Sequence, residues 1–127
     1  MNNTSKNICI TGAGNGIGRA IAIAMSKKGY NVACVDIDID HASETLELIL
    51  AQNGLGLAIK ADVTNNSDIE YMIKSVVDAF GSLDVMVNNA GVTRTSNIMD
   101  LTEKDWNWIN DVNAKGTFFC LQIAAKQ

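Results

Sequence analysis

The chain has 127 residues, of which 47% are apolar and 19% charged, and 14 acidic against 10 basic residues give a net charge of −4. A chain of this length forms one domain at most, and an acidic balance without a basic cluster argues against a nucleic-acid partner. No apolar run approaches the ~20 residues that span a bilayer, and the polar N-terminus, residues 1–6, lacks the apolar core of a signal peptide. We therefore expect a cytoplasmic domain with no membrane partner.

The cysteines and the single histidine do not form a recognisable ligand set. Cys9, Cys34 and Cys120 are scattered without a Cys-x-x-Cys pair, and Cys9 and Cys34 lie inside apolar runs. Buried structural thiols explain this pattern better than metal ligands or nucleophiles. His41 is predicted to lie on the surface, and the sequence predicts no metal site.

The first element is a strand that leads through a glycine turn into a helix. An apolar run, residues 8–10, precedes four glycines, and a helical pattern begins at Ile17 and ends at Gly29. Glycine can adopt positive φ and has no Cβ to keep a ligand away from the backbone. The start of a helix also leaves amide N–H groups unpaired at the positive end of its dipole. This arrangement favours a pyrophosphate site.

The second strand and the following elements continue the alternation. Residues 32–35 are all apolar and end in Asp36, which is typical of a parallel strand buried on both faces. A helix is expected over 41–53, with Asp40 as its N-cap, and with Leu46, Ile49 and Leu50 facing inward. A third strand is expected over 57–59, just before Asp62.

The second half of the chain repeats the pattern of helix and strand. Residues 67–70 have the form of a capping box for a helix that Gly81 ends, and its apolar stripe comprises Ile69, Met72, Ile73, Val76, Val77 and Phe80. A fourth buried strand, 85–87, leads into Asn88-Asn89-Ala90-Gly91, and Thr102 is expected to cap a last helix. The alternation predicts an α/β fold with a parallel sheet, helices on both faces and right-handed crossovers.

Asp36 is the first candidate for ligand recognition. It lies at the end of the second strand, 18 residues after Gly18, close to where a dinucleotide fold places an acid for the ribose diol. A carboxylate there accepts hydrogen bonds from both hydroxyls and repels a 2′-phosphate, and no Arg or Lys lies between Asn31 and Asp40. NAD is therefore favoured over NADP. The alternative is that Asp36 only caps the end of the strand.

Together these segments resemble one known family. The turn from Thr11 to Gly18 resembles the Thr-Gly-x-x-x-Gly-x-Gly motif of the short-chain dehydrogenases/reductases. Asp62-Val63 is similar to the pair that contacts adenine in that family, residues 88–91 are similar to its Asn-Asn-Ala-Gly signature, and Asn113 matches the helical Asn of its catalytic tetrad. The resemblance extends from about Lys6 to Gln127, and it implies a doubly wound, three-layer α/β/α Rossmann-like fold with strand order 3-2-1-4.

The resemblance also implies roles for individual residues. Asn113 would break its helix locally and hold a water in a proton relay, although such a residue often only bonds to a backbone carbonyl. Asn88 would brace the sheet. The remaining residues would bind the cofactor: the turn with Thr11, Gly12, Gly14, Asn15, Gly16, Ile17 and Gly18 at the pyrophosphate, Asp36 at the ribose, Asp62 and Val63 at the adenine, and Asn89, Ala90 and Gly91 near the nicotinamide.

The chain does not contain the rest of the catalytic centre that the resemblance implies. In the family, a serine and a Tyr-x-x-x-Lys pair act after a fifth strand, and this chain ends at Gln127 before that strand would begin. The only tyrosines, Tyr30 and Tyr71, are predicted to be structural. We therefore interpret residues 1–127 as the N-terminal, cofactor-binding half of a larger single-domain oxidoreductase, with its fourth strand left as a long apolar edge.

The activity implied for the whole enzyme is hydride transfer between a nicotinamide and a small alcohol or carbonyl substrate. A homo-oligomer is implied as well, and Trp106 and Trp108 are interpreted as packing or subunit contacts. Two alternatives remain open from the sequence. One is a non-catalytic NAD-binding module that acts as a sensor or partner subunit. The other is an S-adenosylmethionine-dependent methyltransferase, which gives no reason for the motif at 88–91 or for Asn113.

Overall fold

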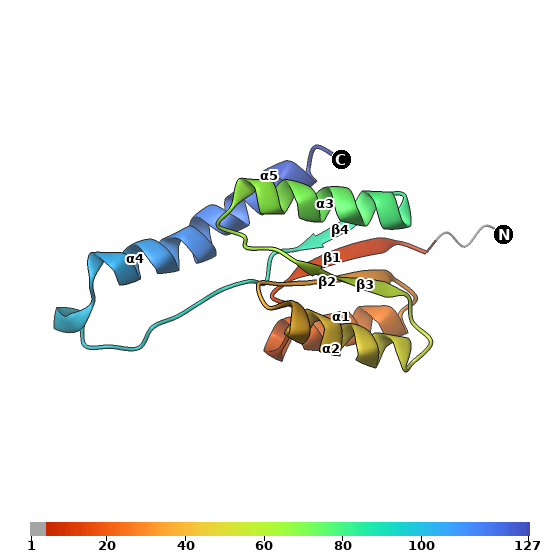
Figure 1. Ribbon diagram of the computed structural model, residues 1–127, viewed down its shortest axis with the longest axis horizontal. Helices are drawn as coiled ribbons and strands as arrows, with labels where there is room; N and C mark the ends of the chain where they lie inside the picture. Colours follow the sequence, from red (N-terminus) through yellow and green to blue (C-terminus); the bar gives the residue numbers. More distant parts are fainter. Residues whose placement is uncertain (1–4) are drawn as a thin grey trace.

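The computed structural model describes residues 5–127, and its centre is a parallel sheet of four strands (Figure 1). Residues 1–4, which form most of the polar N-terminal stretch, lie outside the described residues. The strands are β1 (Asn7–Thr11), β2 (Asn31–Asp36), β3 (Gly56–Lys60) and β4 (Val85–Val87), and their order is β3-β2-β1-β4. The predicted strand order and three-layer architecture are confirmed.

Helices cover both faces of this sheet. The helices α1 (Gly16–Lys27) and α2 (Ile39–Leu50) lie on one face, and α3 (Asn66–Phe80) and α5 (Thr117–Ala124) lie on the other (Figure 1). The helix α4 (Glu103–Asn110) projects beyond the sheet and continues through a π-helical segment, Asp111–Gly116, into α5. A 3-10 turn, Ile98–Asp100, precedes α4. Among the described residues, none of the helices combines the length and apolar character needed to cross a membrane.

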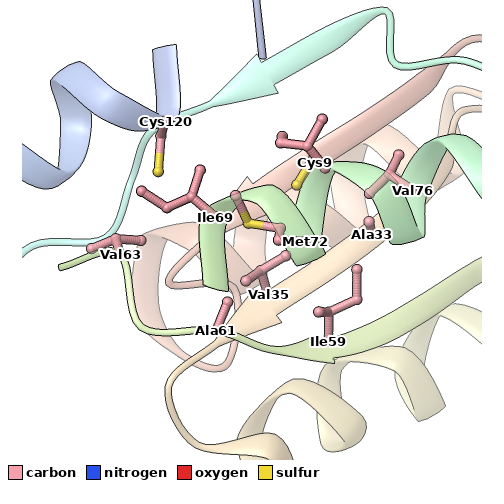
Figure 2. Packing of buried hydrophobic residues seen from close by; sticks show 11 residues of the cluster. Cys9, Ala33, Val35, Ile59, Ala61, Val63, Ile69, Met72, Val76 and Cys120 are labelled. Carbon is pink, nitrogen blue, oxygen red and sulfur yellow. The ribbon is translucent and has the colours of Figure 1, made fainter. Parts of the chain in front are cut away.

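The two faces of the sheet carry separate hydrophobic cores because successive side chains of a strand point in opposite directions. Ile8 and Ile10 of β1 belong to the core under α1 and α2, together with Ala22 and Ile49 of those helices. Cys9 points to the other face, where the core beneath α3 and α5 includes Cys9, Ala33, Val35, Ile59, Ile69, Met72, Val76 and Cys120 (Figure 2). All five residues of β1 are buried, which explains why its sequence is continuously apolar or uncharged.

Two predicted helix starts are wrong. The N-cap of α2 is Asp38 and not Asp40: Asp38 has extended backbone angles, and its side chain accepts the Asp40 N–H at 2.9 Å. The helix α3 starts after Asn65, whose side chain accepts the Asp68 N–H at 3.2 Å, so residues 67–70 do not form a capping box. In both cases an Asp or Asn side chain that lies closer to the preceding strand accepts one of the first free amides of the helix.

Two burial predictions are also wrong. Leu50 is 51% exposed, because the buried stripe of α2 runs through Ala42, Thr45 and Ile49 and one further residue rotates the side chain away from the sheet. The strand β4 is only half-buried and three residues long, since it pairs with β1 on one side and forms an edge of the sheet. The expected edge is therefore present but short.

The predicted N-cap of the last helix is confirmed: Thr102 caps α4 and forms a capping box with Asp105.

The cysteines are free and buried, as expected. Burial raises the pKa of Cys34 to about 12 and that of Cys120 to about 11. Burial also raises the pKa of Cys9, and the neighbouring Cys120 and Cys34 add to this increase. A thiol with a raised pKa forms little of the reactive thiolate.

We therefore expect that none of the three thiols reacts with an aromatic disulfide reagent at about pH 8 in the folded chain, and that all of them react in guanidinium. Rapid modification of a thiol in folded protein would contradict this packing.

Candidate functional site

The carboxyl ends of the parallel strands open into one cleft with a volume of about 510 Å³. The segments that follow β1, β2, β3 and β4 all contribute to it, because parallel strands end at the same edge of the sheet. The cleft contains most of the predicted cofactor-binding residues: Thr11, Gly12, Asn15, Ile17, Asp36, Asp62, Val63, Asn89, Ala90 and Gly91. Gly14, Gly16, Gly18 and Asn113 do not belong to its lining, as far as the described residues define it.

The glycines of the turn between β1 and α1 are needed for different structural reasons. Gly12 and Gly16 have φ values of +63° and +52°, in the left-handed region that favours glycine. A Cβ on Gly18 would lie 2.2 Å from the Gly12 carbonyl oxygen and 2.5 Å from Asn89 Nδ2. A Cβ on Gly16 would meet no atom within 4 Å. Gly18 therefore permits close packing of α1 against the strand ends, whereas Gly16 keeps the start of the helix open.

The start of α1 leaves its first amides available. The side chain of the N-cap residue Asn15 makes no capping hydrogen bond within residues 5–127, and both Asn15 and Ile17 line the cleft. The Ile17 side chain is 74% exposed and borders the cleft instead of entering the core. Unpaired amides at the positive end of a helix form a site for an anion.

Asp36 is held in place by backbone amides on both sides of its carboxylate. Oδ2 accepts the Gly14 N–H at 2.9 Å, and Oδ1 accepts the Asp38 N–H at 3.1 Å. A Cβ on Gly14 would lie 2.6 Å from Oδ2, so this approach requires glycine. Each carboxylate oxygen accepts more than one hydrogen bond. The contacts that fit a strand-end role therefore leave Asp36 able to accept further donors from the cleft that it lines.

Thr11 fastens the end of β4 to the end of β1. Its Oγ1 accepts the N–H groups of Asn89 at 3.1 Å and Ala90 at 3.0 Å. Asn89 Nδ2 in turn donates to the carbonyl oxygens of Thr11 at 3.0 Å and Gly12 at 3.1 Å. The bracing role that we assigned to Asn88 thus belongs to Asn89. Asn88 Oδ1 is buried and has no hydrogen-bond partner among the described residues.

The Asp62-Val63 pair shapes the turn between β3 and α3. Asp62 Oδ1 accepts the N–H of Thr64 at 2.9 Å and its hydroxyl at 2.7 Å, and Asp68 Oδ2 accepts the Asp62 N–H at 2.9 Å. Val63 is 8% exposed and packs into the core of α3 and α5 while it also lines the cleft. Both residues contribute to the wall of the cleft, and both also have structural roles.

Asn113 lies where the last helix departs from α geometry, as predicted, in the π-helical segment Asp111–Gly116. Its Oδ1 accepts the Val92 N–H at 2.7 Å, and its Nδ2 donates to the Val92 carbonyl at 2.8 Å. The alternative of a bond to a backbone carbonyl is therefore confirmed, but the carbonyl belongs to the loop after β4 and not to the helix of Asn113. The pair holds Val92 at the cleft.

A second contact fastens the same loop to α4. Arg94 forms an ion pair with Asp105 at 3.0 Å, and Asp105 Oδ2 also accepts the Thr102 hydroxyl at 2.7 Å. The hydrogen bonds from Thr102 are the main reason that the pKa of Asp105 is lowered, and Arg94 lowers it further. The loop from β4 to α4 is thus attached at Val92 and at Arg94.

Sequence reasoning missed part of the cleft. The additional lining residues are Val35, Ile37, Ala61, Thr64, Val92, Trp108 and Val112. Ile37 and Thr64 directly follow motif residues, so their position next to a strand end could have identified them. Trp108 and Val112 come from the last helix, and no local pattern predicts where that helix lies. Neither Tyr30 nor Tyr71 lines the cleft as the described residues define it: Tyr71 is 62% exposed on α3, and Tyr30 packs against the core of α1 and α2.

Comparison with known proteins gives one consistent family. The family model for short chain dehydrogenase matches residues 6–127. A 3-oxoacyl-[acyl-carrier-protein] reductase FabG of Staphylococcus aureus is 43% identical over 97% of this chain and 50% of its own length. An uncharacterised oxidoreductase of Thermotoga maritima is 39% identical over 100% of this chain and 50% of its own length. The chain spans about half the length of the curated relatives that it matches.

Solved structures agree with the sequence matches. A hydroxysteroid dehydrogenase from Escherichia coli superposes with a TM-score of 0.91 at 30% identity, covering 95% of this chain and 51% of that protein. A short-chain type dehydrogenase/reductase from Mycobacterium marinum superposes with a TM-score of 0.93 at 31% identity, covering 97% of this chain and 50% of that protein. By its motifs, its strand order and these matches, the chain belongs to the short-chain dehydrogenase/reductase family of oxidoreductases.

Proposed function

We propose that the chain is the cofactor-binding half of an NAD-dependent oxidoreductase that interconverts an alcohol and a ketone. The observation that carries the proposal is the placement of Asp36: its carboxylate lies in the same cleft as the open start of α1 and accepts the Gly14 N–H of the glycine turn at 2.9 Å. A dinucleotide needs an anion site and a diol site side by side. The named relatives are reductases, dehydrogenases and oxidoreductases, so nothing among them favours a non-catalytic module or a methyltransferase.

The start of α1 would hold the pyrophosphate. Asn15, Gly16 and Ile17 provide backbone N–H groups at the positive end of the helix, and the open space around the Gly16 Cα fits a ligand that approaches the backbone. The cleft volume of about 510 Å³ is within the range of small-molecule sites. The wall formed by Asp62 and Val63 would border the adenine, and the segment 89–91 would line the nicotinamide side.

Asp36 supports NAD over NADP. A carboxylate is an acceptor only, so it matches two ribose hydroxyls that donate. A 2′-phosphate in the same place would bring two anions together in a cleft that is partly shielded from water. Because the Gly14 and Asp38 amides hold both carboxylate oxygens, Asp36 cannot rotate away from such a phosphate without losing these bonds.

When bound, the nicotinamide supplies the hydride acceptor or donor. From this chain, we assign Asn113 to the proton path, where it would hold a water from its place in the π-helical segment. The relatives are named for a 3-oxoacyl group, which is a ketone, and for a hydroxysteroid, which is an alcohol, and this supports the proposed substrate class. The 127 residues contain no Tyr-x-x-x-Lys sequence. Residues 1–127 would thus form part of one larger domain.

The environment and assembly that we propose follow from the family and the surface. We propose a cytoplasmic enzyme that forms homo-oligomers, consistent with exposed large apolar side chains on α4 and α5, namely Trp106, Trp108, Phe118 and Leu121. Apolar side chains of this size gather at protein interfaces more often than at free surfaces.

Replacing Asp36 tests the assignment of the diol site. We expect Asp36→Asn to weaken NADH binding roughly tenfold, because charge-assisted hydrogen bonds to the hydroxyls are lost. NADPH binding should stay equal or improve, because the repulsion of the 2′-phosphate is removed. Fluorescence titration of both cofactors measures the change. Asp40→Asn removes the same charge at an exposed position in the first turn of α2; it is the control and should leave both affinities unaltered. Equal NADH affinity of Asp36→Asn and the parent chain would refute the assignment.

Activity measurements test the division of labour. We expect the 127-residue chain to bind NADH without oxidising or reducing alcohols and ketones at a measurable rate, since an acid–base tyrosine with a pKa lowered by lysine is missing. Absorbance of NADH with a panel of ketones and secondary alcohols is the assay, and a full-length homologue serves as positive control. Sustained turnover by the pure chain would show that some other group performs the proton transfer.

A further inference from the structure

The glycine turn is held from outside the cleft by side chains of the two covering helices. Thr45 of α2 is fully buried, and its hydroxyl donates to the Ala13 carbonyl at 2.8 Å. Arg19 of α1 donates from Nε to the Thr45 hydroxyl oxygen at 3.0 Å and from its guanidinium to the Gly14 carbonyl. The same guanidinium pairs with Glu44 at 2.9 Å. None of these side chains belongs to the lining of the cleft, as the described residues define it.

These contacts determine which way two peptide planes face. In a trans peptide the C=O and the following N–H point in opposite directions. The Ala13 carbonyl is held by Thr45, and the Gly14 N–H of the same plane is thereby aimed at Asp36 Oδ2, 2.9 Å away. The Gly14 carbonyl is held by Arg19, so the Asn15 N–H of the next plane faces the opposite way. Asn15 lines the cleft.

The two planes need such contacts because glycines flank them. Gly12 and Gly16, with positive φ, lie on either side of the segment, and glycine has the least restricted backbone of any residue. A flip of either plane would exchange an N–H for a carbonyl oxygen, and a carbonyl directed at the cleft would repel an anionic ligand. We propose that Arg19 and Thr45 are positioning residues, which fix the glycine turn so that it presents amides and Asp36 to the dinucleotide. This inference rests on the proposed function.

The hydroxyl of Thr45 is the central member of the network. A hydroxyl has one proton, and the Ala13 carbonyl at 2.8 Å is a much closer acceptor than the His41 carbonyl at 3.4 Å. Its oxygen accepts the Arg19 Nε–H, and this charged donor strengthens the bond that the hydroxyl donates. Glu44 is 59% exposed at its side chain, so its pairing with Arg19 contributes little beyond orientation. The less exposed part of the network, from the half-buried Arg19 through the buried Thr45 to Ala13, therefore does most of the positioning.

Thr45→Val tests the proposal, because valine has nearly the shape of threonine and removes only the hydroxyl. We expect NADH affinity of the 127-residue chain, measured by fluorescence titration well below the melting temperature, to fall roughly tenfold. Thr45→Ser keeps the hydroxyl and should restore affinity to within about twofold of the parent chain. Arg19→Met should weaken binding in the same direction. The matched control is Ile49→Val, one turn further along α2 and equally buried, which should lower the melting temperature but leave NADH affinity unchanged.

Amide hydrogen exchange provides a readout that does not depend on the cofactor. In Thr45→Val, the Gly14 N–H should exchange at least roughly tenfold faster than in the parent chain, while amides in the centre of β1 stay protected. If folded Thr45→Val binds NADH and exchanges its Gly14 N–H as the parent chain does, the inference is overturned. It is also overturned if the control Ile49→Val loses as much NADH affinity as Thr45→Val. If the folded parent chain does not bind NADH, the proposed function fails. The exchange of Gly14 then still decides whether Thr45 holds the turn.

Discussion

The hydrogen bond between the Gly14 amide and the Asp36 carboxylate is the contact on which the site depends. It joins the turn after β1 to the end of β2 at 2.9 Å, and it forms only because Gly14 lacks a Cβ that would lie 2.6 Å from Asp36 Oδ2. One carboxylate thereby borders both the start of α1 and the space between the strand ends. The parallel sheet makes this possible, since it brings the turns after all of its strands to one edge.

A second layer of contacts keeps this edge rigid. Thr11 and Asn89 exchange part-buried hydrogen bonds between the ends of β1 and β4, and a hydrogen bond of this kind contributes about 0.5–1.5 kcal/mol to stability. Because Gly18 has no Cβ, α1 can pack so close to the turn that the Gly12 carbonyl occupies the place where a Cβ would lie. Polar residues of the motif thus hold the scaffold together as well as lining the cleft. This dual use explains why Asn89 lines the cleft and also braces the turn.

Local patterns predicted the strands and the ends of most helices well. Continuous apolarity located β1 and β2, and the left-handed glycines Gly29 and Gly81 follow α1 and α3 where a helix stop was expected. The helix starts were less certain, since Asp38 and Asp40, or Asn65 and Ser67, both satisfy the sequence rule for an N-cap. Only the backbone angles decide between neighbours two residues apart. The half-buried state of β4 likewise depends on its position at the edge of the sheet, which its own three residues do not encode.

The sequence by itself determined the order of strands and helices, the glycine turn and the acid at the end of β2, because each rests on local backbone geometry or on burial of a short segment. Only the tertiary structure decided which residues share the cleft. Trp108 and Val112 reach it from the last helix, which follows all four strands in the sequence. The tertiary structure also decided that Asn113 holds Val92 and that Arg19 and Thr45 hold the turn. The Asn113–Val92, Thr45–Ala13 and Arg19–Thr45 contacts join residues more than twenty positions apart, and spacing along a chain does not specify which distant groups meet.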